Sequence, residues 1–481
     1  MARNLSRNTE LYISTLAPAD LGTADGSNTG LALGTNNTWK VNVLDGYSFS
    51  QDTSTQEIGV SEAASECTGV AGLARATLTF NTALNPVDVS FGVYVRPYDT
   101  SGTLGGDGPS CVELPIWAAA LGTGTHLANS PDTVANAAVF DVATGTTDTL
   151  TFTTEQSDEN ELLVLYLYFV LDSTTYVVGE FSVGTIEADF SIDGIAMLNI
   201  SGSGTTIKEN PSDCHTTIAA WTGDSDYVDV PPTTSASFLR NKLGTLELTD
   251  NQGVAGTGDS EAATSSVSGQ TISGFTGLTV DAYAGGRVYS AAAGAWASIV
   301  SNTATAITVA AYEDISDANW NGTAVDAFLP ESHAAVSYCI PITGGSLTLE
   351  NNMSYLTPEE LAIVNQPLAG FTGSRSISGS VTAYLNTGAM GSGGLLQDLL
   401  EKTTEVSNDF ELKFHMGGDT TSAPRVDFII PHAQIGIPTT NVEDIISTEI
   451  TFNAKSWNAT LEAQSFEGAN EMTVVYVTQQ A

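Results

Sequence analysis

The sequence predicts a mainly β protein, with two tandem β-sandwich or partial-barrel domains that each carry one short helix, plus a small all-β insert domain. Segments in which apolar and polar side chains alternate recur along the chain, and this alternation is typical of half-buried strands. Several of these segments occur twice, about 290 residues apart. Charged residues make up only 14% of the 481 residues, so Thr, Ser, Asn and Gly have to supply the polar surface, which favours strands and turns over helices.

The longest repeated strand covers residues 87–96 and returns at residues 377–386. Apolar side chains dominate the odd-numbered positions of both copies, and Tyr94 matches Tyr384. Alternation places one set of side chains in a core and the other set on the opposite face. The expected core residues of the first copy are Val87, Val89, Phe91, Val93 and Val95.

Two further segments extend the repeat. Residues 47–52 match residues 347–352 with an offset of 300, and the closing strand at 186–192 matches the one at 447–453. The polar face of both closing strands is partly acidic and has no Lys or Arg. An ordinary solvated sheet face mixes charges of both signs, so this face is a candidate functional surface.

Each copy has one short helical segment after its long strand. The first covers residues 112–121 and contains Trp117. The second covers residues 395–406, with Ser392 as a possible N-cap and a leucine stripe on one face. We expect each helix to close one end of a sandwich or barrel.

The division of the chain follows from these matches and from local composition. A stretch with three prolines and little periodicity separates the two copies and is typical of a linker. A Gly-, Ala-, Ser- and Thr-rich region interrupts the opening hairpin of the second copy, and hairpin tips tolerate insertions because their ends stay close together. The predicted parts are domain 1 at 1–204, the linker at 205–237, domain 2 at 238–251 and 336–466, an all-β insert at 252–335 on the exterior, and a C-terminal tail at 467–481.

The net charge is strongly negative. Lys and Arg number 14 and Asp and Glu number 55, which leaves −41 at pH 7. A field of this sign repels phosphates and excludes a nucleic-acid-binding groove. Two interpretations remain, solubility alone or a wall past which DNA moves without sticking.

The cysteines and the N-terminus predict a reduced protein. Cys67, Cys111, Cys214 and Cys339 lie far apart without C-x-x-C spacing, so we expect neither a disulfide framework nor a metal cluster. Residues 1–7 lack the apolar core of a signal peptide, and no run approaches the ~18 apolar residues of a membrane span. We therefore expect assembly in a cytoplasm and no membrane contact.

No catalytic motif is present in the sequence. It has no H-E-x-x-H, no G-x-S-x-G and no Gly-Lys-Ser/Thr. Residues 253–258 are Gly-rich but predict a turn, and the acidic segment 224–229 lacks the glycine and closing glutamate of a calcium loop. The histidines are scattered at His126, His215, His333, His415 and His432. We expect no enzyme activity, no cofactor and no metal.

Several segments in order resemble one known family. Residues 339–345, 351–358, 371–373, 379–386 and 437–440 are similar to the second tube domain of tail tube proteins from T-five-like long-tailed phages, and residues 7–9 and 52–63 are similar to the first. The resemblance covers about residues 5–456 apart from the insert. The insert departs from the family's pattern, so its role is not part of what the resemblance implies.

The resemblance implies a structural virion protein with two fused tube domains per subunit. Three subunits would then form a ring that imitates a hexamer, and rings would stack into a tail tube that conducts the genome into the host. The implied partners are further copies of the chain, a tape measure protein inside, and terminator and tip proteins at the ends. Double-stranded DNA would pass without specific binding, and the location would be the virion tail. A bacterial surface or adhesin-type protein with a glycan-binding insert is the alternative.

Alternation and the resemblance together select candidate residues for two surfaces. The predicted lumen-facing residues are Ser48, Ser50, Ser90, Tyr94, Glu187, Asp189, Asp193, Glu350, Ser380, Thr382, Tyr384 and Glu449. The loops that would reach a neighbouring ring are residues 52–84 and 352–374. Their predicted contact residues are Asp52, Gln56, Glu57, Glu62, Arg75, Asn352, Tyr355, Glu359 and Phe371.

Overall fold

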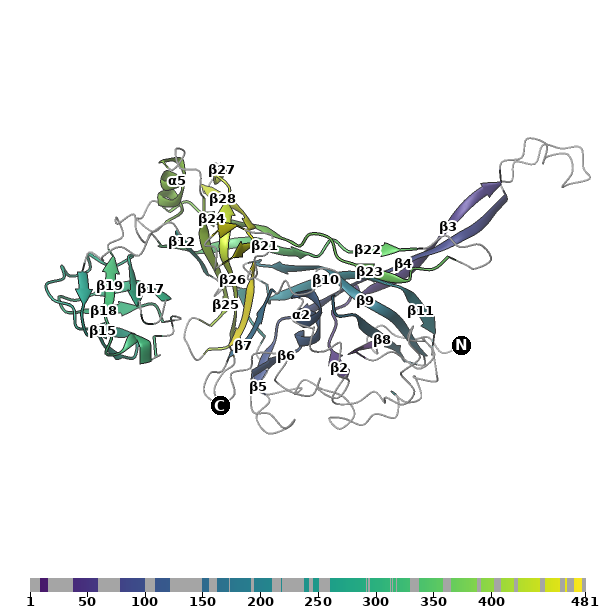
Figure 1. Ribbon diagram of the computed structural model, residues 1–481, viewed down its shortest axis with the longest axis horizontal. Coiled ribbons are helices and arrows are strands. Elements are labelled where there is room, and N and C mark those ends of the chain that lie inside the picture. Colours follow the sequence, from purple (N-terminus) through teal and green to yellow (C-terminus); the bar gives the residue numbers. More distant parts are fainter. Residues whose placement is uncertain are drawn as a thin grey trace, which may run out of the picture.

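The computed structural model confirms the mainly β fold, with strands throughout and two short α-helices in the part it describes (Figure 1). The described residues are 9–15, 38–58, 78–99, 109–121, 149–154, 162–172, 174–191, 194–209, 218, 238–241, 245–250, 260–290, 292, 295–311, 313, 315–316, 318–328, 337–357, 365–386, 391–401, 408–418, 423–441, 446–458, 463–464 and 471–477.

The first half of the chain, here called unit 1, has two layers of strands. One layer contains β3, β4, β10 and the second half of β9, and the other contains β1, β2, β8, β11 and the first half of β9. Its elements are β1 (Thr9–Ser14), β2 (Thr38–Val41), β3 (Ser48–Ile58), β4 (Leu78–Tyr94), β5 (Pro97–Asp99), β6 (Pro109–Cys111), α2 (Leu114–Leu121), β7 (Thr149–Thr153), β8 (Leu165–Leu171), β9 (Thr174–Asp189), β10 (Met197–Gly204) and β11 (Thr206–Glu209).

The second half, unit 2, repeats these pairings. The strand pairs β12–β20, β12–β25, β25–β26, β21–β24 and β24–β28 match β1–β2, β1–β8, β8–β9, β3–β4 and β4–β10. Its elements are β12 (Thr245–Asp250), β20 (Ser337–Ile340), β21 (Ile342–Glu350), β22 (Ser354–Leu356), β23 (Ala369–Phe371), β24 (Ser376–Tyr384), α5 (Ser392–Glu401), β25 (Phe410–Gly417), β26 (Arg425–Ile435), β27 (Thr439–Asn441), β28 (Ser447–Ala454), β29 (Trp457–Asn458), β30 (Ala463–Gln464) and β31 (Thr473–Val477).

The register of the repeat differs from the sequence match. In unit 1, Ser90 pairs with Ser48, and in unit 2 its counterpart Ser380 pairs with Ser346. The structural offset between β3 and β21 is therefore 298, not 300. A slip of two residues leaves every side chain on the same face, so alternation alone cannot detect it.

The match of the closing strands was also wrong. β28 pairs with β24 as β10 pairs with β4, so the strand at 447–454 is the counterpart of β10 rather than of residues 186–192. Both β9 and β10 alternate apolar and polar side chains. Their partners distinguish them, and partners become visible only in the folded sheet.

One apolar core fills both units. The predicted core side chains of β4 are confirmed, because Val87, Val89, Phe91, Val93 and Val95 are at most 4% exposed. Phe190 of unit 1 stacks on Phe414 of unit 2 with ring centroids 5.2 Å apart, and Phe452 also packs against Phe414, at 5.2 Å. The two units are therefore joined by packing as well as by the chain.

The predicted linker and tail both contain strands. Residues 206–209 form β11 and pair with β9, so the connection between the units begins after them. The segment expected as a tail contains β31, which pairs with β26 of unit 2 and β7 of unit 1. Val474 and Tyr476 are fully buried. Burial alternates along Thr473–Val477 as in an ordinary strand, and the predicted division into domains did not include this strand.

The two helices lie close to the predicted segments. Trp117 of α2 is buried, and its Nε1 donates a hydrogen bond to the Tyr476 hydroxyl at 2.7 Å, so α2 packs against unit 2. The predicted N-cap role of Ser392 is not what the structure shows. Ser392 Oγ donates to the Tyr384 carbonyl and accepts from the Asn386 amide, both at 3.0 Å, which ties α5 to the end of β24.

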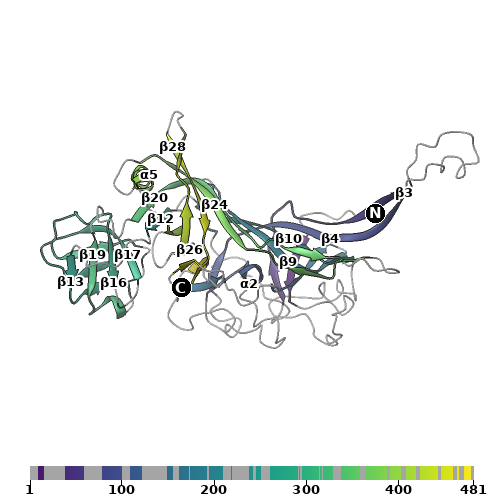
Figure 2. The same ribbon diagram turned by 45° about the horizontal axis from the view of Figure 1, so that its top comes forward.

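The insert forms a separate body between β12 and β20 (Figures 1 and 2). Its seven strands follow the order β13–β19–β16–β17–β18–β15–β14 around an apolar core that shares no residue with the core of the two units. Its elements are β13 (Ser260–Ala262), β14 (Ser266–Ser268), β15 (Thr271–Ser273), β16 (Arg287–Ser290), β17 (Ala295–Asn302), β18 (Ala306–Val309), the 3-10 helix η5 (Ala318–Trp320) and β19 (Val325–Phe328).

Candidate functional site

A polar face extends across both units on the sheet β3–β4–β10–β9–β21–β24–β28, on the side opposite the core. The sheet passes from unit 1 to unit 2 where β9 pairs antiparallel with β21. We call this contact the internal joint and the surface above it the polar face. Side chains that are paired across neighbouring strands point to the same side, so the register gives the members of this face directly.

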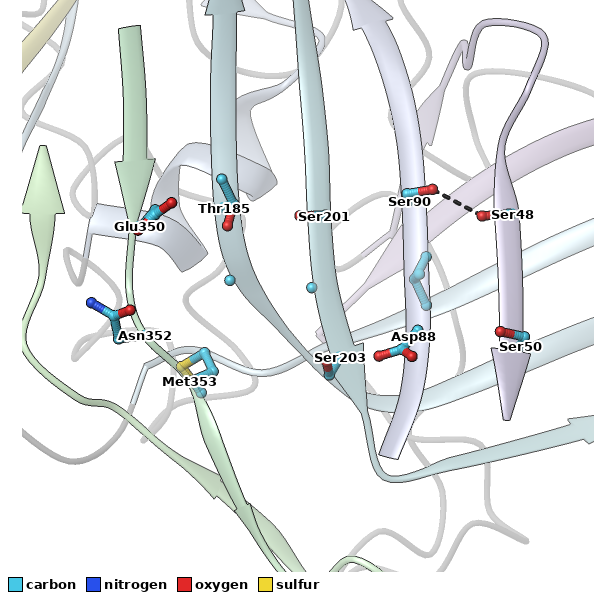
Figure 3. Close-up of a pocket in the computed structure, with 13 residues that line it drawn as sticks. Ser48, Ser50, Asp88, Ser90, Thr185, Ser201, Ser203, Glu350, Asn352 and Met353 are labelled. Atoms are coloured by element: carbon cyan, nitrogen blue, oxygen red, sulfur yellow. Dashed lines mark hydrogen bonds between the residues drawn. The ribbon is translucent and has the colours of Figure 1, made fainter. Parts of the chain in front are cut away.

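One row of the polar face shows how the units meet. Ser48 and Ser90 share a hydrogen bond of 2.9 Å, Ser90 lies opposite Ser201, Ser201 opposite Thr185, and Thr185 opposite Glu350 of unit 2 (Figure 3). The next rows continue through unit 2 in the same way. They contain Glu187 beside Thr348, Asp189 beside Ser346, Ser380 beside Thr451, Thr382 beside Glu449, and Tyr384 beside Ser447.

The predicted lumen-facing residues therefore come together on one surface, with one exception. Asp193 lies outside the described residues. The others share the polar face and are exposed or half-buried, namely Ser48, Ser50, Ser90, Tyr94, Glu187, Asp189, Glu350, Ser380, Thr382, Tyr384 and Glu449.

The charge of this face has one sign. The charged residues among the described positions of the polar face are all acidic, namely Asp88, Glu187, Asp189, Glu350 and Glu449. Ser, Thr, Asn and Gly occupy most of the remaining positions. Such a surface offers short hydroxyls and negative charge but no cation to hold a phosphate.

The polar face is hollowed beside the internal joint. An open depression of about 520 Å³ lies over β3, β4, β10, β9 and β21, with Ser48, Ser90, Asp88 and Ser203 on one side and Glu350 on the other (Figure 3). The depression is shallow and its lining is polar, whereas sites for small organic ligands are mostly apolar and enclosed. The depression therefore fits the concave wall of a larger surface better than a ligand site.

The described parts of the predicted first loop, residues 52–58 and 78–84, belong to β3 and β4. β3 and β4 stay paired as far as Ile58 and Leu78, and they form an arm that projects well beyond the body of the molecule (Figures 1 and 2). Asp52, Gln56 and Glu57 lie exposed on this arm. Glu62 and Arg75 fall outside the described residues.

The predicted second loop contains the short hairpin β22–β23 and lies against the first arm. The Leu84 amide of β4 donates to the Asn365 carbonyl at 2.9 Å. Tyr355 donates its hydroxyl hydrogen to the Ser203 carbonyl, and Asn352 donates its side-chain amide to the Ser374 carbonyl at 2.6 Å. These two predicted contact residues are therefore bonded within their own chain. Phe371 is exposed, and Glu359 lies outside the described residues.

Exposed apolar side chains gather at the two ends of the polar-faced sheet. Phe80, Leu356, Leu368 and Phe371 lie on or beside the two arms. Ile195, Phe238, Tyr384 and Ile446 lie at the opposite end, where β4, β10, β24 and β28 begin or finish; we call them the rim. Exposed apolar groups of this kind commonly mark contacts with other proteins.

The Glu113 carboxyl is buried beside the core of the two units. Burial raises the pKa of the Glu113 carboxyl to about 7, although Tyr476 donates a hydrogen bond to it. The described residues contain no group of three or more His, Cys, Asp or Glu side chains able to hold a metal ion. None of the helices in the described ranges is long and apolar enough to cross a membrane.

Sequence reasoning missed two features of the site. The internal joint β9–β21 pairs residues about 160 positions apart, and no local pattern indicates such a contact. The second feature is a buried cluster of charges between the insert and unit 2. Its members are scattered along the chain, although an arginine inside a strand of the low-charge insert was a signal that could have been noticed.

Comparison with known proteins identifies a similar phage protein. No protein-family model matches the chain. The chain is 25% identical over 459 residues to the tail tube protein pb6 of Escherichia phage T5, which covers 94% of this chain and 73% of that protein. The resemblance to T5-like tail tube proteins is thereby confirmed.

Proposed function

We propose that the chain is a structural virion protein that assembles into stacked trimeric rings, and that these rings form a phage tail tube through which the genome is delivered. One observation carries this proposal. The polar, acidic face crosses from unit 1 to unit 2 without interruption, as the wall of a conduit built from repeated units would. The similarity to a T5 tail tube protein supports the same function.

The internal joint supplies a template for contacts between copies. At this joint Asp189 of β9 pairs with Met197 on one side and with Ser346 of the next unit on the other. A closed sheet removes open strand edges, which otherwise promote uncontrolled association. Repeating the joint between chains closes the sheet without any new type of contact.

The repeat predicts the register of the joint between copies. Asn441 of β27 pairs with Ser447 of β28, just as Asp189 of β9 pairs with Met197 of β10. No other described strand pairs with β27. Ser48 is the counterpart of Ser346, and the outer edge of β3 has no partner among the described strands. Asn441 of one copy should therefore lie opposite Ser48 of the next, with Thr440 opposite Phe49 and Thr439 opposite Ser50.

Stacking of rings would use the ends of the sheet. The arms carry exposed apolar groups at one end, and the rim carries exposed apolar groups at the other. Contact between unlike ends is heterologous and does not close, so rings joined in this way grow into a tube. The insert lies on the side of unit 2 away from the polar face and would stand on the exterior. A tape measure protein inside and terminator and tip proteins at the ends complete the proposed virion tail, which would be assembled in the host cytoplasm.

A disulfide test examines the joint directly. Ser48→Cys combined with Asn441→Cys places two thiols on paired positions of neighbouring copies, and mild oxidation should give covalent species that end at the trimer. Ser90→Cys with Asn441→Cys is the matched control. Both cysteines of the control lie on the same face, but they are two strand spacings apart instead of one. Their Cα atoms would be about 10 Å apart, which exceeds the roughly 7 Å that a disulfide tolerates.

The outcome is read on a denaturing gel, with single-cysteine variants reporting the background from Cys67, Cys111, Cys214 and Cys339. A ladder that continues past three chains would contradict a closed trimeric ring. No cross-linking in assembled tubes would contradict the register, and absence of tubes or rings by electron microscopy would contradict the proposed function itself.

A further inference from the structure

The start of unit 2 is bound to unit 1 at the internal joint. Residues 238–241, which precede β12, are here called the unit 2 entry segment, and they lie along the connection between β9 and β10. The Ala196 amide donates to the Leu239 carbonyl at 2.9 Å, and the Asn241 amide donates to the Gly194 carbonyl at 3.2 Å. The unit 2 entry segment therefore adds a short stretch of antiparallel pairing to unit 1.

These two bonds fix the register of the contact. They flank Ile195 and Arg240, which form an antiparallel bridge. A pair flanked in this way is not itself hydrogen-bonded, and its Cα atoms lie about 4.5 Å apart. The Asn241 side-chain amide also donates to the carbonyl of Asp189, the last residue of β9, at 3.1 Å. Because Asp189 also pairs with β21, the contact is part of the internal joint.

The corresponding position of unit 2 is more exposed. The Val95 amide donates to the Ala196 carbonyl at 2.9 Å, and the Leu385 amide donates to the Ile446 carbonyl at 3.0 Å, so Ile446 is the counterpart of Ala196. Ala196 is fully buried, whereas Ile446 is 39% exposed. The position that the entry segment covers in unit 1 is therefore open in unit 2.

An aromatic contact shows the same difference. Phe238 and Tyr94 pack in a T-shaped arrangement with ring centroids 5.5 Å apart, and Tyr94 is half-buried. Its counterpart Tyr384 is 54% exposed. Arg96 also lies over the Phe238 ring, 4.8 Å from the centroid, but Asn386 replaces it in the repeat, so the cation–π contact is specific to the internal joint.

The chain contains a second segment of the required type. Just before β1 the sequence is Leu5-Ser6-Arg7-Asn8, and the unit 2 entry segment is Phe238-Leu239-Arg240-Asn241. Both contain an Arg-Asn pair and an apolar side chain two positions before it. Residues 5–8 lie outside the described residues, but Thr9, which begins β1, has its Oγ1 2.8 Å from the Tyr47 hydroxyl. The chain therefore enters β1 beside the start of β3, where the joint between copies is proposed.

We propose that residues 3–8, the unit 1 entry segment, bind unit 2 of the neighbouring copy in the ring. They would pair with the connection before β28 and cover Ile446 and Tyr384, as residues 238–241 cover their counterparts in unit 1. This inference rests on the proposed tube function and specifies one contact within the ring. Phe238 stays 51% exposed while its segment is bound, so the rim keeps apolar surface for stacking.

Charge complementarity supports a second copy as the partner. Arg3 and Arg7 are two of only 14 Lys and Arg residues in a chain of net charge −41. The connection before β28 carries Glu443 and Asp444. Opposite charges on the two segments favour this pairing and its orientation over contacts between like-charged surfaces.

Paired cysteines test the register. Ile445 and Ile195 both stand two positions before their strands, β28 and β10, so Ile445→Cys with Arg7→Cys reproduces the pair of Ile195 and Arg240 between copies. A Cα separation of about 4.5 Å lies within the range of a disulfide. Mild oxidation of assembled tubes should give covalent species of two and three chains.

A second test pair allows for the length of the connection. From the Arg-Asn pair to the first core residue, Leu11 in β1 or Leu246 in β12, the chain is two residues shorter in unit 1. Leu5→Cys with Ile445→Cys therefore places the thiol two positions earlier, on the same side of the segment. Cross-linking from either position supports the proposed contact, and cross-linking from neither overturns it.

The matched control uses the equivalent connection of unit 1. Ile195→Cys with Arg7→Cys should give no product between chains, because residues 238–241 already occupy that position. Ile195→Cys with Arg240→Cys is the positive control, and its disulfide should form within one chain. A control product as abundant as that of the test pairs would contradict binding at unit 2.

A second readout needs no cysteine. The amide of Ile446 should exchange slowly in tubes and rapidly in free subunits, because its counterpart in Ala196 donates to the entry segment. Deletion of residues 2–8 leaves β1 complete and should remove this protection. The deletion should also raise the subunit concentration needed for tubes by about 30-fold, the effect of losing two hydrogen bonds of ordinary strength.

The outcomes separate this contact from the tube function. Tubes that form at an unchanged concentration without residues 2–8 would overturn the contact and leave the tube function standing. Absence of cross-links from both cysteine positions in tubes that do form would have the same meaning. Absence of tubes from the unchanged protein would refute the tube function and, with it, the contact.

Discussion

Reversing the charge of the polar face tests whether its acidity matters for DNA passage. Glu187 is exposed and lies between Asn199 and Thr348, and Asp189 lies two positions further along the same face. The Glu187 side chain is exposed, so its replacement by lysine should change the free energy of unfolding by no more than about 0.5 kcal/mol. The double variant Glu187→Lys, Asp189→Lys should therefore still assemble.

The magnitude follows from the number of cations presented to DNA. Three copies per ring would place six new lysines on the inner wall in place of six acids. Each lysine that pairs with a phosphate releases counterions and contributes about −0.9 to the slope of log affinity against log salt, so full engagement of one ring gives a slope near −5. The variant wall should hold DNA at low salt and release it at high salt.

The assay is the rate of DNA release from particles that carry the variant, measured from low to high salt. Release should be slow at low salt and recover as salt rises. The matched control is Glu261→Lys with Asp281→Lys, which changes the net charge equally on exposed positions of the insert. Normal release by the variant at low salt would refute the assignment of this face to the lumen, and slow release by the control would show that net charge alone is responsible.

Two further predictions concern the shared core. Phe414→Ala removes a buried ring that packs on Phe190 and Phe452, and it should lower the free energy of unfolding by about 3–5 kcal/mol and reduce hydrogen-exchange protection in both units. The control Phe275→Ala removes a ring from the insert core and should leave the hydrogen-exchange protection of unit 1 unchanged. If Phe414→Ala reduced protection in unit 2 alone, the two units would not share a core. The raised pKa of Glu113, about 7 in the fold, should make the protein less stable as the pH rises from about 4.5 to 7, by up to about 3 kcal/mol in denaturant titrations. Glu113→Gln should abolish this slope, and an unchanged slope would remove Glu113 as its source.

Alternation was sufficient to predict the fold class and the two faces of the sheet. A strand such as β4 places Val87, Val89 and Phe91 on one side and Ser90 on the other whatever its neighbours are, so the sequence by itself indicates which side is buried. The order of the family-like segments was sufficient to identify the resemblance, which the comparison with a T5 tail tube protein confirmed. Both inferences depend on local sequence patterns, which can be recognised without knowing which strands pair.

The tertiary structure decided what depends on distant partners. The offset of 298 between β3 and β21 and the identity of β28 as the counterpart of β10 came from strand pairing, because a slip of two residues leaves every face unchanged. The internal joint and the contacts of Phe414 with both units bring together residues that no local pattern connects. The buried cluster of charges between the insert and unit 2, which includes Glu247 and Arg287, follows the same rule. Its charges are ordinary when read one at a time, and only the fold brings them together between two separate cores.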